Sequence, residues 1–192
     1  MKSKKGGNFE RETAKYLSYW WTDGDRDDII WHTHSSGGRA TERLKKGMNT
    51  AFQYGDLCPT VRIAYPLFDV FLFELKRGYT TEVDLLAFVD KLDRNKDPLI
   101  FQWWNKIEKE REQAGCPYSL LIIKRDRHRR VVMFNYGLYK EMEENGGDWK
   151  YSRQAIIKYR GQQLVILLLN EFLECMVQEI VLGMRNDRLG RG

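Results

Sequence analysis

The stretch from Asp69 to Lys76 limits the possible folds of this chain more than any other feature, because it has the pattern of a strand buried on both faces. Residues that favour β-structure run through it without a break. Alternation places Phe71, Phe73 and Leu75 on one face, and Val70, Leu72, Glu74 and Lys76 on the other. A strand that is apolar on both faces is typical of a central position in a sheet covered by helices. We therefore expect an α/β fold with this strand at its centre.

Residues 8 to 21 have the periodicity of an amphipathic helix. One side holds Phe9, Thr13, Ala14, Tyr16, Leu17, Trp20 and Trp21, and the other holds Arg11, Lys15 and Ser18. Glu10 falls inside the apolar arc, whereas Glu12 lies at its polar margin. Because an unpaired buried carboxylate is too costly to keep, we expect Glu10 to point inward towards a partner.

Turn and capping residues divide the rest of the chain into further elements. We expect strands at Ile29–His34, Tyr118–Lys124 and Val131–Phe134, with the last two joined as a hairpin. Helices are expected from Thr81 to about Leu92, and from Asp97-Pro98 to Gly115. The last part has two interpretations: strands at Ala155–Tyr159 and Leu164–Leu169 before a helix from Asn170 to about Leu182, or one continuous helix from Gln162 to Leu182.

No repeat, low-complexity tract or linker divides the 192 residues, so we expect one domain, with a core at about 6–135 and an extension at about 150–185. The formal charge of +5, from 32 basic and 27 acidic residues, favours polyanionic partners. Cys58, Cys116 and Cys175 are too dispersed for a disulfide framework or a zinc ribbon, which fits a reducing, cytoplasmic compartment. The longest apolar run, Leu164–Leu169, is far shorter than the roughly 20 residues of a membrane span.

Glu74 and Lys76 form the first chemical candidate, because side chains two residues apart on a strand stand about 6–7 Å apart on one face. Hydrolysis of a phosphodiester requires an activated water and neutralisation of growing negative charge. Mg²⁺ prefers oxygen ligands, so Glu74, a second carboxylate and the Leu75 carbonyl suit it, while Lys76 can orient or deprotonate the water. The triplet alone is also typical of a surface ion pair.

Asp56 supplies the second carboxylate, in Tyr54-Gly55-Asp56-Leu57 before the strand that carries Glu74. An ordinary turn aspartate is the alternative, because Gly55 and Pro59 flank it.

Four segments in order resemble the PD-(D/E)xK nuclease superfamily, and within it the Holliday-junction-resolvase branch and related phage or plasmid proteins. They are Gly6-Gly7-Asn8-Phe9-Glu10-Arg11-Glu12, His34-Ser35-Ser36-Gly37-Gly38, Gly55-Asp56 and Phe73-Glu74-Leu75-Lys76. The resemblance covers residues 6 to 76 and is topological beyond them. Gly55 replaces the proline of the namesake motif, and 17 residues, 39 to 55, separate the Ser-Gly loop from Asp56, where compact resolvases have almost none. Strict junction specificity therefore does not follow from it.

The resemblance implies a restriction-endonuclease-like mixed β-sheet flanked by helices, and a Mg²⁺- or Mn²⁺-dependent endonuclease acting on DNA. Asp56, Glu74 and Lys76 would form the metal and water centre, and Glu10 would complete the metal site. The likeness to resolvases also implies a homodimer, in which two sites cut two strands.

Several other side chains are candidates for DNA contact. Ser35, Ser36 and Arg39 correspond to a loop that family members bring to the scissile phosphate, and Arg11 neighbours Glu10. Basic residues also cluster at Arg43, Lys45 and Lys46, and again at Lys124, Arg125, Arg127, Arg129 and Arg130. Phosphate contact is one reading of these residues, and solvated turn, helix or hairpin surface is the other.

Gln102 lies on the helix after the Glu74 strand, where some superfamily nucleases carry a glutamine near the site. The pairs Trp20-Trp21 and Trp103-Trp104 fit core positions better than base stacking. His32 and His34 share a strand face but lack a third zinc ligand nearby.

Two other classes of protein compete with the nuclease. A non-catalytic nucleic-acid-binding module would keep the fold and the basic surface, but would not cleave. A structural protein would use the aromatic core and the last helix for partner assembly, and its Glu10, Asp56 and Glu74 would face apart.

Overall fold

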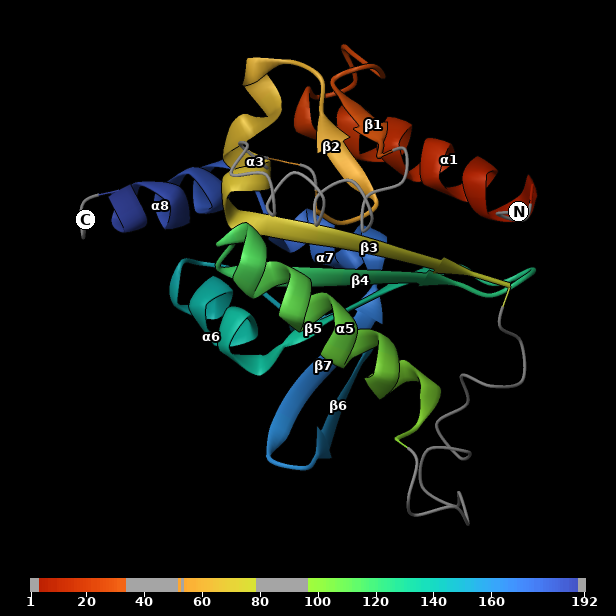
Figure 1. Cartoon of the computed structure of the whole chain (residues 1–192). Helices are drawn as coiled ribbons and strands as arrows, with labels where there is room; N and C mark the ends of the chain where they lie inside the picture. Colours follow the sequence, from red (N-terminus) through yellow and green to blue (C-terminus); the bar gives the residue numbers. More distant parts are fainter. Residues whose placement is uncertain (1–3, 34–51, 53, 79–96, 190–192) are drawn as a thin grey trace.

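Five strands form a mixed sheet in the order β3-β4-β5-β7-β6, with helices on both faces (Figure 1). The computed structural model describes residues 4–33, 52, 54–78 and 97–189. The strands are β3 (Phe71–Arg77), β4 (Tyr118–Lys124), β5 (Arg130–Asn135), β6 (Gln154–Tyr159) and β7 (Gln162–Leu168). β3 and β4 are parallel, and the other neighbours are antiparallel. A separate antiparallel pair joins β1 (Ile30–His32) to β2 (Leu57–Pro59). These observations confirm the expected α/β class.

The helices divide the core into two layers. They are α1 (Lys4–Trp21), η1 (Arg62–Ala64), α3 (Tyr65–Val70), α5 (Leu99–Ala114), α6 (Tyr136–Glu144), α7 (Leu169–Cys175) and α8 (Gln178–Leu189). α5 covers one face of the sheet, where its Trp104 packs with Leu72 and Leu121. α1 and α7 cover the opposite face, which includes Phe73 of β3. Both faces of β3 are therefore buried, as its sequence predicts.

The predicted central position of the Asp69–Lys76 strand is wrong in two respects. β3 lies at an edge of the five-stranded sheet, and it begins only at Phe71, since Asp69 and Val70 end helix α3. The segment at Gly55-Asp56 runs along the outer edge of β3, with the Asp56 N–H donating to the Phe73 carbonyl over 2.7 Å. Burial on both faces thus comes from the helices and does not require a strand on each side.

Most of the other predicted elements are confirmed. The β4–β5 hairpin, α5 with Gly115 as its left-handed cap, and the strands near 155–159 and 164–168 are present, although α5 begins at Leu99, with Pro98 as N-cap. The continuous helix from Gln162 to Leu182 is wrong, and the helical region after β7 is divided into α7 and α8. The first predicted strand is limited to Ile30–His32. The helix expected at 81–92 lies outside the described residues. No described helix meets the length and apolarity that a membrane crossing requires.

Helix α1 has the predicted apolar face, with one exception. Ser18, placed on the polar side, is fully buried. Its hydroxyl donates to the Ala14 carbonyl over 2.9 Å and accepts from the Ile30 N–H over 3.1 Å. The short side chain thus connects α1 to β1, a long-range contact that helical periodicity does not encode.

Gly55 allows the chain to pass close to β3. Its φ is +75°, and a Cβ at this position would lie 2.6 Å from the Phe73 carbonyl oxygen. We expect Gly55→Ala to lower the free energy of unfolding by about 2–4 kcal/mol, from the left-handed backbone and the clash together. Gly24→Ala is the matched control, because Gly24 has φ +90° with open space around it and should cost only about 1 kcal/mol. Equal losses of unfolding free energy in the two variants, measured by denaturant titration, would show that the close contact of Gly55 with β3 does not affect stability.

Candidate active site

Asp56 and Glu74 meet at the outer edge of β3, and both are buried. The Leu75 N–H donates to Asp56 Oδ2 over 2.9 Å. With the bond from the Asp56 N–H to the Phe73 carbonyl, this contact fixes Asp56 against the strand. Thr33 holds the other side of the segment, since its N–H donates to the Asp56 carbonyl over 2.9 Å and its hydroxyl to the Gly55 carbonyl over 2.7 Å.

The main-chain carbonyl of Leu75 belongs to the same edge. In a strand, the N–H and C=O of one residue point to the same side. Since the Leu75 N–H points to Asp56, its carbonyl also lies on the outer edge, away from β4. Two carboxylates and one main-chain carbonyl are therefore on this edge.

Glu74 contacts two ammonium groups. Lys76 Nζ binds Glu74 Oε1, and Lys106 Nζ lies 3.3 Å from the same oxygen. Lys76 Nζ is also 6.0 Å from the centroid of the Trp103 ring, on α5. Burial lowers the pKa of Lys106, but the carboxylates of Glu74 and Glu110 raise it by more, so its pKa is above the usual value. Two cations thus compensate the charge of Glu74.

Asp56 is held as a carboxyl group that ionises with difficulty. Burial and the nearby Glu74 carboxylate raise the pKa of Asp56 to about 7, and the charge of Glu10 acts in the same direction. The Leu75 N–H and the Lys76 ammonium oppose this shift. Near neutral pH, a small change in the surroundings of Asp56 therefore changes its charge.

Glu10 points inward from α1, as its position in the apolar arc predicts. It is 8% exposed, and its charge acts on Asp56. Glu12 instead lies at the surface and faces Lys124 and Arg130 of the hairpin. The first helix therefore directs one carboxylate to the edge of β3 and the other away from it.

The oxygen atoms at the β3 edge fit a hard divalent cation. Asp56 and Glu74 provide carboxylates and Leu75 provides a carbonyl. A cation would offset both the burial and the repulsion by Glu74 that raise the pKa of Asp56. In the part of the chain that the structure describes, no three His, Cys, Asp or Glu side chains form a cluster that could hold a metal ion. The main-chain carbonyl and water would therefore have to supply the remaining ligands.

The other predicted side chains are more dispersed. Arg11 is exposed on α1. Gln102 is also exposed, and its amide donates to the Asp97 carbonyl over 2.7 Å at the start of α5. Trp103 and Trp104 are core residues. Ser35, Ser36, Arg39, Arg43, Lys45 and Lys46 lie outside the described residues, as does His34.

Lys106 is the residue at this site that sequence reasoning missed. It lies one turn after Gln102 on α5, and its spacing to Glu110 is that of an ordinary surface ion pair. Only the packing of α5 against β3 brings it to Glu74. The spacing of four from Gln102 was the available signal, since both residues lie on one side of the helix.

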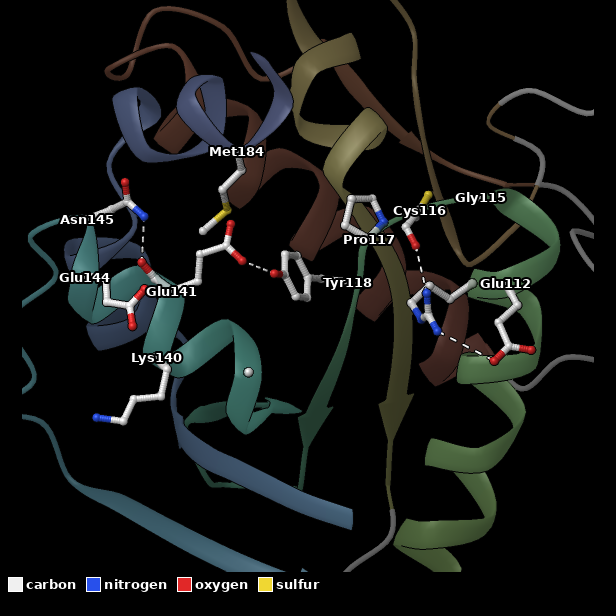
Figure 2. A pocket seen from close by; sticks show the side chains of 12 residues that line it. Glu112, Gly115, Cys116, Pro117, Tyr118, Lys140, Glu141, Glu144, Asn145 and Met184 are labelled. Carbon is white, nitrogen blue, oxygen red and sulfur yellow. Dashed lines mark hydrogen bonds and ion pairs between the residues drawn. The ribbon is translucent and has the colours of Figure 1, made fainter. Parts of the chain in front are cut away.

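A cavity of about 1040 Å³ lies at the other end of the sheet, where β4 begins (Figure 2). Tyr118 points into it and donates from its hydroxyl to Glu141. Lys140 and Met184 also line this cavity, and none of the predicted site residues does. The described site residues that the sequence predicts to be catalytic therefore lie at the β3 edge and not in this cavity.

Comparison with known families decides the assignment. Residues 1–181 match the model of a family described as "Phage putative PDDEXK endonuclease". The chain belongs to the PD-(D/E)xK nuclease superfamily. The mixed sheet flanked by helices agrees with the restriction-endonuclease-like fold of these nucleases. Neither the curated proteins nor the solved structures gave a match. The two segments that resemble the name motif of PD-(D/E)xK nucleases, Gly55-Asp56 and Glu74-Leu75-Lys76, meet at the β3 edge.

Proposed function

We propose that the chain is a divalent-metal-dependent endonuclease that hydrolyses DNA phosphodiester bonds. The observation that carries the proposal is the pair of buried carboxylates, Asp56 and Glu74, beside the main-chain carbonyl of Leu75 on the outer edge of β3. Two adjacent buried acids destabilise a fold unless a cation or a shared proton compensates them. Membership in an endonuclease family supports a catalytic reason for keeping them.

Each residue has a distinct role in this proposal. Asp56, Glu74 and the Leu75 carbonyl would hold Mg²⁺ or Mn²⁺, and the Glu10 carboxylate would add negative charge from α1. When bound, the ion would supply positive charge beside the scissile phosphate and a lower pKa for a coordinated water. Lys76 would hold the attacking water beside Glu74, and in its neutral form its amine would accept the proton that the water loses. Burial between α1 and α5 limits solvent around the reacting groups, which strengthens each of these electrostatic interactions.

A panel of DNA substrates tests the proposal. The wild-type chain is incubated with linear duplex, single-stranded, flap and four-way-junction DNA, with Mg²⁺, with Mn²⁺ and with EDTA. We expect cleavage with either metal and none with EDTA. Salt-sensitive binding of these substrates without cleavage in any metal would instead favour a non-catalytic nucleic-acid-binding module.

The same panel tests the finer resemblance to Holliday-junction resolvases. Preferred cutting of the four-way junction at paired positions would support it and would also require two sites. We propose a homodimer on that basis. Sedimentation as a monomer at assay concentrations, with and without junction DNA, would remove the dimer but leave the nuclease intact.

Lys106 is expected to contribute less than Lys76. Its side chain is 59% exposed, and partly exposed ion pairs contribute up to about 1 kcal/mol. Lys106→Ala should therefore lower the cleavage rate by no more than about fivefold. Lys109→Ala, on the same helix, is the control and should leave the rate unchanged. A loss with Lys106→Ala as large as that with Lys76→Ala would reverse the assignment of the two lysines.

A further inference from the structure

A second, basic cavity of about 400 Å³ lies between the start of α7, the β4–β5 hairpin and α1. Seven described residues line it: Tyr16, Lys124, His128, Arg129, Arg130, Leu169 and Asn170. Four of them are basic residues or histidine, and none of the seven is acidic. The cavity therefore has the charge of an anion site.

Its cations are oriented by neighbouring groups. The Arg130 guanidinium lies over the Tyr16 and Phe9 rings, at 5.3 and 5.9 Å from their centroids. Arg129 donates to Asn170 Oδ1 over 2.8 Å. These contacts hold two guanidinium groups at the cavity before any ligand arrives, which lowers the entropy cost of binding.

The positive charge in the cavity is incompletely compensated. Lys124 and Arg130 are directly opposite each other in the β4–β5 ladder, an arrangement that is unfavourable for like charges. They share one carboxylate oxygen, Glu12 Oε2, at 3.7 and 3.6 Å, and Glu12 is half exposed. Arg130 Nε is buried without a hydrogen-bond partner among the described residues. An acceptor with several oxygen atoms would satisfy these donors better than Glu12 does.

The cavity lies at the same end of the sheet as the candidate active site. Lys124 is opposite Arg77 in the parallel β3–β4 ladder, and Arg77 directly follows Lys76. Figure 1 shows β3 and β4 ending at the same side of the sheet, near the start of α1. α1 carries both Glu10, at the β3 edge, and Glu12, which pairs with the cavity residues Lys124 and Arg130. A polyanion that crosses this end of the sheet can therefore reach both places.

We propose that this cavity binds a backbone phosphate of the DNA substrate at a position other than the scissile phosphate, and that Glu12 competes with that phosphate for Lys124 and Arg130. The inference rests on the proposed function. It assigns to Lys124, Arg129 and Arg130 the positioning of DNA and not the chemistry of cleavage.

DNA binding is measured in an Asp56→Asn background, so that cleavage does not interfere, by fluorescence anisotropy from about 50 to 200 mM salt. We expect the double variant Lys124→Gln/Arg129→Ala to bind duplex DNA about 3–10-fold more weakly. We also expect the slope of log Kd against the logarithm of the salt concentration to fall by about one. The matched control is Lys158→Gln/Arg153→Ala, which removes the same two charges from exposed positions in and beside β6 at the far edge of the sheet. Equal effects of the two pairs would overturn the proposal.

Glu12→Gln gives a change of opposite sign, which misfolding cannot imitate. We expect it to tighten DNA binding by about 2–3-fold, because the competing carboxylate is lost. Glu143→Gln is the control, since Glu143 is similarly exposed and paired with Lys140 on α6. An equal gain in DNA affinity in both variants would show that the effect comes from the net charge of the protein, and would contradict a local role for Glu12.

A measurement with inorganic phosphate distinguishes a cavity that binds DNA from one that binds a free anion. If phosphate raises the thermal midpoint of the wild type but not of the Lys124→Gln/Arg129→Ala pair, while both bind DNA equally, the cavity is a free-anion site and the proposal is wrong. Wild-type cleavage is assayed in parallel. Cleavage together with unchanged binding by the cavity variants refutes only this inference, whereas a wild type that neither binds nor cleaves DNA refutes the proposed function.

Discussion

Replacing Lys76 with alanine is expected to lower the rate of DNA cleavage by about 10²–10³-fold or more, while DNA affinity stays nearly constant. Lys76 binds Glu74 and is partly buried, so its charge acts in surroundings where electrostatic effects are stronger than in water. The loss should be in kcat, because the water that we propose Lys76 to hold matters in the transition state and little in DNA binding.

Two further variants make the Lys76 experiment specific. Lys158→Ala removes an exposed lysine at the far edge of the sheet and should leave cleavage unchanged. Lys76→Arg keeps the positive charge but cannot give up a proton at neutral pH. Activity close to wild type in Lys76→Arg would show that Lys76 only positions the water and neutralises charge. Activity close to wild type in Lys76→Ala would exclude Lys76 from catalysis.

Asp56→Asn is expected to abolish metal-dependent cleavage and, at the same time, to stabilise the metal-free protein at pH 8. The pKa of Asp56 is about 7 in the folded state, against about 3.9 in an unfolded chain. Between these values the folded state retains a proton that the unfolded state has lost. Stability from this group is therefore fully present below about pH 4 and falls as the pH rises through 7.

The asparagine removes the charge and keeps an oxygen that can accept the Leu75 N–H. We expect the gain in unfolding free energy to be on the order of 2–4 kcal/mol at pH 8 and less than half as large at pH 5. Mg²⁺ should raise the thermal midpoint of the wild type, more at pH 8 than at pH 5, and should leave Asp56→Asn unchanged. Asp25→Asn, at an exposed position, is the control and should change none of these values. If Asp56→Asn is instead less stable than the wild type at pH 8, the claim that the ionised Asp56 carboxylate destabilises the metal-free fold is contradicted.

The sequence predicted best those features that depend on local patterns. The alternation in β3, the inward direction of Glu10 and the β4–β5 hairpin follow from periodicity and turn residues, and each is present. These patterns report which face of an element is apolar. They do not report which element covers that face. The pattern of β3 therefore predicts a central strand, whereas β3 lies at the edge of the sheet, covered by helices and by the Gly55-Asp56 segment.

The contacts between distant elements account for the remaining differences. Lys106 reaches Glu74 because of the rotation of α5 about its axis, which no spacing within the helix specifies. Ser18 is buried because β1 returns to α1, and the short side chain joins the two. The period of residues 162 to 182 was ambiguous, and pairing of β7 with β5 and β6 decided in favour of a strand.

The most direct test of the metal centre is a crystal structure of the chain with Mn²⁺, read by anomalous scattering. We expect a single strong peak at the β3 edge, about 2.0–2.5 Å from oxygen atoms of Asp56, Glu74 and the Leu75 carbonyl, with Lys76 displaced from Glu74 towards a bound water. The contrary result is the absence of a peak there while Glu74 keeps its contacts with Lys76 and Lys106, in crystals of protein that cleaves DNA with Mn²⁺ in solution.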